Sequence, residues 1–362
     1  MRIIIDIGHP AHVYLFKNVA TEMQNKGHTF LFTVRSGEKE SYLIEKFGFK
    51  YRIIGRKQRG TLLKLLGLVI FTFRIIIVSL KFKPDLFLSH GSMYAGYASR
   101  VIGKSHIALE DSGNMEQLRL SLPVSDVILT PDALKEEYGK KQIRYNGYHE
   151  LMYLTPKYFI PDESIFKILS ARVKSPYAVL RFVSWEASHD KGRTGLSQDE
   201  KMELVNHLIS RGVNVLISSE KELPTELQVY RMDVPFEMVH HLLAFAIIYV
   251  GEGATMASEA GILGIPSFYV SPIRRCYNDD QEKYGTVYNF PSFEGVLSKL
   301  DYVLSNPQIL NNHKVLARKL ISDKIEVTDF IVWFLENWPS SNQIMREDPN
   351  YMNRFRGSFF TA

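Results

Sequence analysis

Residues 250–268, VGEGATMASEAGILGIPSF, place two glycines and a threonine between an apolar run and a run of small residues. The preceding run, AFAIIYV, is typical of a strand buried on both faces, and MASEAGILG has helical spacing. A strand, a glycine turn and a helix in this order leave the backbone N–H groups of residues 253–255 at the positive end of a helix dipole, which suits a phosphate or diphosphate. The turn therefore predicts a diphosphate site made of Gly251, Gly253, Ala254 and Thr255.

Glu259 lies four residues after Thr255, so the two side chains share one face of the predicted helix. A capping box would need an acid where the sequence has Ser258, so capping gives Glu259 no role. A carboxylate one turn below a diphosphate can accept two hydrogen bonds from the hydroxyls of a ribose. The alternative is that the glycines allow close helix packing and that Glu259 is a solvated helix residue.

Polar residues also follow the other predicted strands, in GHPAHV, HGSMYAG, EDSGN, SWEASHD and SSEKE. In open parallel sheets ligands bind beyond the carboxyl ends of the strands, so these loops are the ones that could form a site. We expect one cleft between two domains, with the diphosphate in the second domain. His9, His12, Glu110 and Asp111 of the first domain would face it.

His12 is the first candidate for a general base, because the start of a helix lowers the pKa of an imidazole and keeps it neutral. Both His9 and His12 could instead cap the helix or fill the turn. Glu110 and Asp111 are adjacent, so on an extended segment only one of them can face the cleft. We expect one to be a base or to bind a hydroxyl, and the other to be a structural acceptor.

Arg181 lies inside the apolar strand VLRFV, where an unpaired cation is costly. A bound phosphate or Glu220 could pair with it, and Glu220 is the preferred partner. Ser219, in the same SSEKE loop, is a further candidate for ligand binding. His189 with Asp190, and His240 with His241, lack a third ligand at metal spacing, so we predict no metal site. Ser92 is not in a G-x-S-x-G elbow and GHPAHV lacks the dinucleotide fingerprint, which argues against a hydrolase and a dehydrogenase.

The composition of the 362 residues is typical of a globular protein of two domains, with 45% hydrophobic and 23% charged residues. Cys276 is the only cysteine, which excludes an intrachain disulfide and a cysteine-based zinc cluster. The chain starts with a strand pattern, RIIIDIG, rather than a signal peptide. We expect a cytoplasmic protein.

Residues 59–83 contain the most apolar window of the chain, with basic residues among and around it. A spanning helix would put Arg74 near the middle of a bilayer, at a cost of about 3 kcal/mol. On a helical wheel the basic side chains fall within an arc of roughly 140° away from the large apolar ones. This indicates an in-plane helix that binds the inner membrane surface, or a core helix with a basic solvent face. Nucleic acid is not expected, because the aromatic residues lie on the apolar side.

Strand-like and helical runs alternate along the chain in two series, which predicts an α/β protein with two doubly wound sheets. The first domain is expected at 1–150, a connector at 151–176 and the second domain at 177–324. A helix at 325–338 is apolar enough to pack back on the first domain, and 339–362 reads as a loosely ordered tail.

Five segments in one order resemble an uncharacterised family of GT-B-type glycosyltransferase homologues that occurs in archaea and in bacterial surface-polysaccharide loci. They are GHPAHVYLFKNVATEMQNKGH, NGYHELMYL, LRFVSWEASHDKGRTGLS, LISSEKELP and VGEGATMASEAGILGIP, and the similarity spans about residues 1–335. More distantly the chain is similar to non-hydrolysing UDP-N-acetylglucosamine 2-epimerases and to the membrane-associated transferase that forms lipid II. The resemblance implies a GT-B fold, a nucleotide-sugar donor held mainly by the second domain, an acceptor near the first and no required metal.

Applied to this chain, the GT-B donor pattern also puts the diphosphate at Gly253 and Thr255 and the ribose at Glu259. Glu252 departs from that pattern, because its charge between the glycines would oppose a diphosphate unless the side chain points away. We expect a metal-independent glycosyltransferase that moves a sugar from a nucleotide sugar to a surface-glycan or lipid-linked acceptor. A UDP-sugar is the first candidate for the donor. The alternatives are a nucleotide-sugar 2-epimerase and a non-catalytic subunit that binds nucleotide sugars or recruits partners to the membrane.

Overall fold

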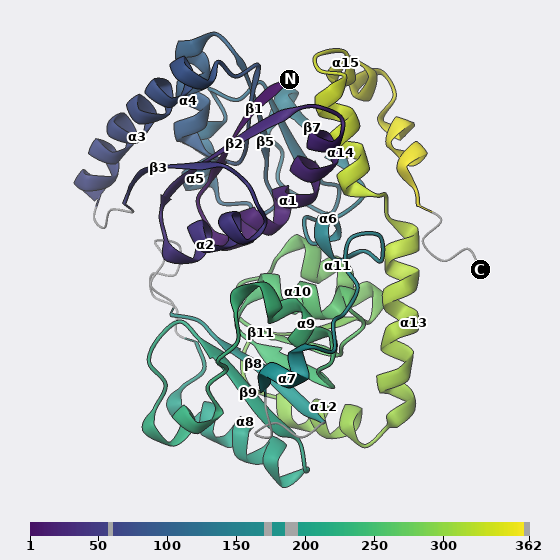
Figure 1. Cartoon of the computed structure of the whole chain (residues 1–362). Helices are drawn as coiled ribbons and strands as arrows, with labels where there is room; N and C mark the ends of the chain where they lie inside the picture. The colour runs from purple at the N-terminus through teal and green to yellow at the C-terminus, as the bar shows by residue number, and fades with distance from the viewer. Residues whose placement is uncertain (57–60, 170–175, 185–194, 358–362) are drawn as a thin grey trace. The chain divides into compact units, whose positions relative to one another are not determined.

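The chain folds into two compact units, each built on one parallel sheet (Figure 1). A computed structural model describes residues 1–56, 61–169, 176–184 and 195–357. Unit 1 comprises residues 1–153 and 324–357, and unit 2 comprises residues 154–323. The sheets have seven and five strands, which confirms the predicted α/β class with two doubly wound sheets.

The sheet of unit 1 has the order β3-β2-β1-β4-β5-β6-β7, and every neighbouring pair is parallel. The central strands are mostly apolar because helices cover both faces of the sheet, and polar residues such as Asp6 and Ser89 lie toward their carboxyl ends. The strands are β1 Arg2–Ile7, β2 Thr29–Ser36, β3 Tyr51–Arg56, β4 Leu86–His90, β5 Ser105–Leu109, β6 Val127–Pro131 and β7 Gln142–Tyr145.

The helices of unit 1 form two neighbouring groups. Helix α1 contacts α2 and α14, whereas α3 contacts α4, which in turn contacts α5 (Figure 1). Short elements, the 3-10 helix η1 (Gly139–Lys141) and helix α6 (Leu151–Leu154), complete the first segment of the unit. The main helices are α1 Pro10–Asn25, α2 Glu38–Lys46, α3 Thr61–Phe82, α4 Met93–Ile102, α5 Met115–Ser121 and α14 Val327–Glu336.

The C-terminal segment of unit 1 is ordered beyond Pro339, where the sequence predicts a loose tail. Helix α15 spans Ser340–Glu347 and the 3-10 helix η6 spans Pro349–Phe355. Met345 is buried, and the ring of Tyr351 stacks on Trp333 of α14 at 4.8 Å between centroids. The expectation is therefore wrong for residues 340–355, because a few apolar side chains in a polar stretch are enough to fix it on α14.

The sheet of unit 2 has the order β12-β11-β10-β8-β9, again with every neighbouring pair parallel. Helices α8 and α12 share one core with the sheet, and α7, α9 and α10 share a core on its other face. The strands are β8 Tyr177–Phe182, β9 Asn214–Ser219, β10 Ile248–Gly251, β11 Ser267–Val270 and β12 Val287–Phe290. The helices are α7 Ile165–Leu169, α8 Gln198–Ser210, η4 Thr225–Tyr230, η5 Phe236–Met238, α9 Val239–Ala244, α10 Ala254–Ile262, α11 Cys276–Tyr284, α12 Val296–Leu304 and α13 Pro307–Asp323.

Helix α3 buries only part of its apolar surface. Phe71 and Ile75 are 4% and 0% exposed and pack in a core cluster with β1 and α4. Four of the apolar residues that a core helix would have buried are exposed instead: Leu66, Val69, Phe73 and Leu80. The alternative of a core helix with a basic solvent face is therefore wrong for these residues. Within the part of the chain that the structure describes, no helix has the length and apolarity needed to cross a membrane.

Replacement of Phe330 by alanine tests whether the C-terminal segment is integral to unit 1. Phe330 is fully buried and its ring contacts Tyr145 of β7 as well as Phe334 and Phe355. We expect Phe330→Ala to lower the free energy of unfolding by about 3–5 kcal/mol, because it leaves a cavity in the core. Urea denaturation measures the change, with the exposed Val315→Ala as a control that should stay within about 0.5 kcal/mol of the parent protein. An unchanged midpoint for Phe330→Ala would show that the segment is peripheral.

Candidate functional site

Each sheet reverses its strand order at one position, and this position determines where a site can form. In unit 1 the chain runs outward from β1 to β3 and then returns to β4 on the other side of β1. In unit 2 it runs from β8 to β9 and returns to β10 on the other side of β8. The loops on either side of such a reversal diverge and leave a crevice at the carboxyl ends of the strands. The candidate residues of each unit gather at its reversal.

A buried carboxylate, Asp6, links three segments under the crevice of unit 1. It accepts hydrogen bonds from Thr33 Oγ1 at 2.7 Å, Arg35 Nη1 at 2.8 Å and Ser92 Oγ at 2.5 Å. A Cβ atom at Gly8 would lie 2.5 Å from Arg35 Nη2, so only glycine lets the guanidinium lie against the β1–α1 loop. The result is a fixed cation beside the end of β1.

The two histidines at the start of α1 have different roles. His9 is the N-cap of α1, and its Nδ1 accepts from the N–H of Ala11, so for this residue the predicted alternative of helix capping is confirmed. His12 Nδ1 accepts from the N–H of Gly8 at 3.3 Å. The neutral ring therefore carries its proton on Nε2. Burial, and then the charge of His90, keep the pKa of His12 well below its usual range.

His12 is thus neutral, as expected, and burial is the main cause of its lowered pKa. A neutral imidazole with a proton on Nε2 is a hydrogen-bond donor at that nitrogen. His12 could act as a base only if Nδ1 left Gly8, so this geometry does not favour the predicted role. Its ring stacks on the ring of His90, with 4.6 Å between centroids.

Asp111 lies between two histidines that sequence reasoning did not single out. Its Oδ1 is 3.1 Å from His90 Nε2, and its Oδ2 is 2.9 Å from His149 Nδ1. His149 Nε2 is buried and has no hydrogen-bond partner among the residues that the structure describes. Because Nδ1 faces the carboxylate, Nε2 is the ring nitrogen of His149 that another group could contact.

His90 and Asp111 determine the charges of this cluster. Burial lowers the pKa of His90, but the hydrogen bond with Asp111 and the charges of Glu110 and Asp111 outweigh it and raise the pKa to about 9. Burial would raise the pKa of Asp111, but His149 and His90 together hold it well below its usual range. At neutral pH an imidazolium and a carboxylate are therefore locked together beside the neutral His12.

Glu110 and Asp111 have different partners, as expected for adjacent residues of an extended segment. Glu110 is 2% exposed and accepts from the N–H of Ser112 at 2.7 Å and from its hydroxyl, so it holds its own loop. Asp111, with its side chain 13% exposed, bridges the histidines. The ligand atoms of His90, Asp111 and His149 lie within 4.8 Å of one another and could hold a metal ion. Nothing in this arrangement tests the prediction of no metal, which stays a prediction.

In unit 2, glycines let Arg181 at the end of β8 approach the β10–α10 turn. A Cβ atom at Gly251 would lie 2.6 Å from the Arg181 carbonyl oxygen, and one at Gly253 would lie 3.0 Å from Arg181 Cγ. Gly253 is the N-cap of α10, so Ala254 and Thr255 form its first turn, where N–H groups have no intrahelical acceptor. Glu252 is buried and accepts from the N–H groups of Val183 and Leu196 at 2.9 and 2.6 Å. The carboxylate therefore points to the loop after β8, whose N–H groups stabilise its charge, which is the condition under which the sequence argument allows a diphosphate at the turn.

Arg181 has the internal partner that the sequence favours. Its Nη2 is 2.5 Å from Glu220 Oε1 and its Nη1 donates to Ser218 Oγ at 2.7 Å. The Arg181 side chain is 21% exposed, so the guanidinium is neither fully buried nor freely solvated. Arg181 is a cation held next to the α10 turn.

Glu259 is neither solvated nor without a partner. It is 6% exposed, and its Oε1 is 2.9 Å from Nε2 of the buried His240 in α9. The alternative of a solvated helix residue is therefore wrong, and ribose binding would require Glu259 to serve a ligand alongside His240. The other metal-like pair that the sequence offers, His189 with Asp190, lies outside the described residues.

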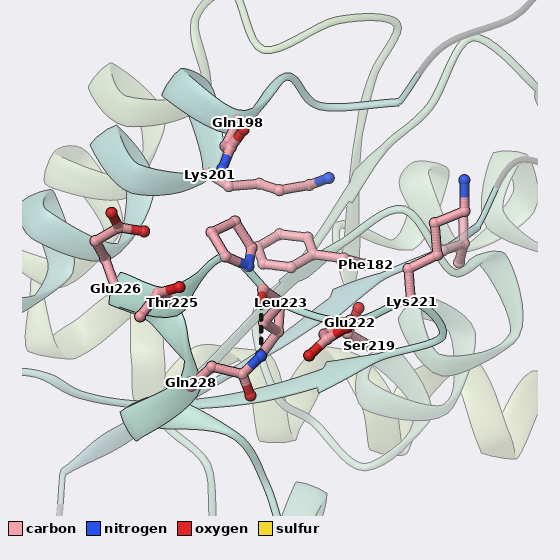
Figure 2. Close-up of a pocket in the computed structure, with 12 residues that line it drawn as sticks. Phe182, Gln198, Lys201, Ser219, Lys221, Glu222, Leu223, Thr225, Glu226 and Gln228 are labelled. Atoms are coloured by element: carbon pink, nitrogen blue, oxygen red, sulfur yellow. Dashed lines mark hydrogen bonds between the residues drawn. The ribbon is translucent and has the colours of Figure 1, made fainter.

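Ser219 lines a pocket of about 730 Å³ at the ends of β8 and β9. Figure 2 shows Phe182 and Leu223 within it, with Lys201 and Lys221 at its sides. The ammonium group of Lys201 lies 5.1 Å from the centre of the Phe182 ring. Gln228 Nε2 donates to the carbonyl of Leu223 at 2.6 Å, which holds the far wall in place. Polar and apolar lining of this kind could receive part of an organic ligand.

The structure therefore gathers the predicted residues in two places. His12 and Asp111 lie together in unit 1, both in contact with His90, and Glu110 lies beside them. In unit 2, Arg181 lies at Gly251 and Gly253, and Ser219 lies in the neighbouring pocket. Sequence reasoning missed Asp6, Arg35, His90 and His149. His90 directly ends a predicted strand and could have been found by the rule used for His9.

The fold is that of GT-B glycosyltransferases and nucleotide-sugar 2-epimerases. The chain is similar to the Staphylococcus aureus MnaA–UDP co-structure (TM-score 0.68, 12% identity, 92% of this chain and 97% of that one). It is similar to UDP-GlcNAc 2-epimerase from Neisseria meningitidis bound to UDP-GlcNAc (TM-score 0.63, 12% identity, 88% of this chain and 94% of that one). It is also similar to spinosyn rhamnosyltransferase SpnG complexed with thymidine diphosphate (TM-score 0.60, 14% identity, 93% of this chain and 100% of that one). These identities establish the fold alone.

Residues 1–284 match the family described as protein of unknown function DUF354, and the chain belongs to that family. It is 26% identical over 291 residues to the uncharacterized protein MJ0665 of Methanocaldococcus jannaschii, covering 74% of this chain and 81% of that protein.

Asp111→Asn tests the charge arrangement of unit 1. Without the carboxylate, burial dominates, and we expect the pKa of His90 to fall from about 9 to below its usual 6.5. Because the pKa of His90 is raised in the folded state, protonated His90 adds to the free energy of unfolding. This contribution is complete below pH 6.5 and is lost as the pH rises through about 9. Unfolding measured across this range should show the loss in the parent protein and not in the variant.

Imidazole NMR titration reads the pKa of His90 directly. The matched control is Asp301→Asn, which removes the carboxylate that lies 2.8 Å from His207 in unit 2 and should leave His90 unchanged. If His90 titrates near 6.5 in the parent protein, the proposed charge pair does not exist.

Proposed function

We propose that this protein is a glycosyltransferase that moves a sugar from a nucleoside diphosphate donor, a UDP-sugar foremost, to a cell-surface glycan or lipid-linked precursor. No cofactor other than the donor substrate and no metal ion is part of the proposal. A cytoplasmic location fits such a donor. The observation that carries the proposal is the approach of Arg181 to the glycine turn that opens α10.

The turn has the features that a diphosphate needs. Helix α10 has nine residues, and the N–H groups of Ala254 and Thr255 belong to its first turn, at the positive end of its dipole. Arg181 adds a cation beside Gly253. A diphosphate leaving group bound here would be stabilised as its charge develops, which is what a metal ion supplies in other enzymes.

The nucleoside would lie next to the diphosphate. Glu259 is one turn into α10, and a ribose hydroxyl could share its carboxylate with His240. Ser219 and the pocket it lines offer a second polar surface near the end of β8. The solved structures with UDP, UDP-GlcNAc and thymidine diphosphate support a nucleotide donor for this fold.

Unit 1 holds groups that are suited to proton transfer. In glycosyl transfer an acceptor oxygen bonds to the anomeric carbon, the bond from that carbon to the diphosphate breaks, and the acceptor proton goes to a base. His149 Nε2 suits this base, because Asp111 orients the ring through Nδ1 and Nε2 has no other partner among the described residues. His12 would then donate a hydrogen bond rather than take the proton.

A thermal-shift screen of nucleoside diphosphates and their sugars tests the donor site. A ligand at 100 times its dissociation constant adds about 2.7 kcal/mol to the free energy of unfolding. We expect stabilisation by one nucleoside diphosphate family and a smaller shift for Glu259→Gln, which removes the carboxylate. The matched control is His240→Gln, which breaks the same buried pair but keeps the carboxylate.

Equal nucleotide shifts in both variants would limit Glu259 to a structural role. The absence of any shift in the parent protein would contradict the donor site itself.

A 2-epimerase is the second candidate, supported by the charged histidine cluster and by the fold of the Neisseria enzyme. Such an enzyme eliminates and re-adds the diphosphate of its own substrate and exchanges a ring proton. Incubation with UDP-GlcNAc in deuterated water distinguishes the epimerase from the glycosyltransferase. We expect no deuterium at C2 without an acceptor and UDP release only with one; deuterium at C2 in the absence of an acceptor would establish the epimerase. Nucleotide binding with neither reaction would indicate a non-catalytic subunit.

A further inference from the structure

The exposed face of α3 forms a continuous apolar strip in unit 1. Its six members are 40–69% exposed: Leu66, Val69, Ile70, Phe73, Ile77 and Leu80. Their spacing places them within an arc of about 100° along four turns of one helix. Ile53 of the neighbouring strand β3 is also 57% exposed. An exposed apolar surface of this extent is typical of a binding site rather than of ordinary protein surface.

The segment of the chain that carries this strip has charges of one sign. Residues 46–84 contain ten lysines and arginines and no aspartate or glutamate. The net charge of the whole chain is only +5, so the rest of the chain is net negative and the basic excess is confined to this segment. Arg74 and Lys81 are exposed and lie along one edge of the apolar strip. Arg52 and Arg56 of β3 are exposed as well.

We propose that the α3 strip binds the surface of a membrane that contains anionic lipids. The apolar side chains would enter the boundary between headgroups and acyl chains while the cations beside them contact phosphate groups. A second copy of this chain fits less well, because two such surfaces would bring two basic segments together. A spanning mode would bury Arg74 in hydrocarbon. The helix therefore lies in the plane of the membrane surface.

This surface is formed by α3 and β3 alone, so the inference goes beyond the proposed function and can fail or hold independently of it. If both hold, the protein would meet a lipid-linked acceptor where that acceptor resides. Membrane attachment would then raise the local concentration of the acceptor without any contact in the candidate site.

Flotation with vesicles tests the proposal. We expect the full chain to float with vesicles of phosphatidylglycerol and phosphatidylcholine, to bind vesicles of phosphatidylcholine alone less, and to be released by salt. The triple variant Val69→Ser, Phe73→Ser, Leu80→Ser should lower the partition coefficient about ten-fold or more. The matched control, Ile160→Ser, Val229→Ser, Val315→Ser, removes three exposed apolar side chains from unit 2 and should bind as the parent does.

Lys81→Glu should weaken binding to anionic vesicles, whereas Lys104→Glu, at another exposed lysine of unit 1, should have little effect. Thermal melting and the nucleotide shift should be unchanged in every variant, which separates this surface from the donor site. No flotation of the parent protein would overturn the proposal. So would a parent dimer that the α3 triple variant converts to monomer without any change in vesicle binding.

Discussion

The reversal of strand order in each parallel sheet is the constraint on which the candidate site depends. All strands of such a sheet end on one edge, and the reversal leaves the loops of two adjacent strands free to diverge. In unit 1 His12 and His90 lie beside this divergence and their rings stack, and in unit 2 Arg181 and the α10 turn lie beside it. Residues far apart in the sequence become neighbours because of topology. The same rule places different side chains at the two reversals: a cluster of histidines and carboxylates in unit 1, and an arginine beside a glycine turn in unit 2.

Charges at these crevices are fixed by partners that a ligand does not need to displace. Asp6 holds Arg35 from below, and Asp111 holds His90 and His149. A buried charge without such a partner would be costly, and a partner that is already in place lets the charge act without reorganisation. Glu252 follows the same logic in unit 2, because its carboxylate stabilises the loop after β8 through backbone N–H groups. The acid that appears, from sequence, to oppose an anion instead helps to shape the crevice that would receive it.

The fold could be predicted from the sequence further than the site could. Apolar strands alternating with helices determine two doubly wound sheets, and the glycine turn before α10 falls where the pattern puts it. The partner of Arg181 could also be predicted, since a cation in a buried strand requires a nearby acid. The environment of Glu259 could not, because His240 approaches it from another helix and nothing local encodes that contact. Periodicity likewise indicates an apolar face on α3, but the packing of Phe71 and Ile75 decides which face remains exposed.

The histidines show most directly why residue type does not give function. His9 caps a helix, His12 accepts a backbone N–H and so keeps its proton on Nε2, and His90 is held as a cation by Asp111. His149 shares that carboxylate, yet its second nitrogen has no partner among the described residues. One side chain thus has four roles, and in each case the atom bonded to one ring nitrogen determines what the other nitrogen can do. Sequence reasoning assigned the base to the histidine at the start of a helix because that position keeps an imidazole neutral. Neutrality is necessary for a base but not sufficient, because the nitrogen that takes the proton must also be without another partner, and among the described residues His149 Nε2 has none.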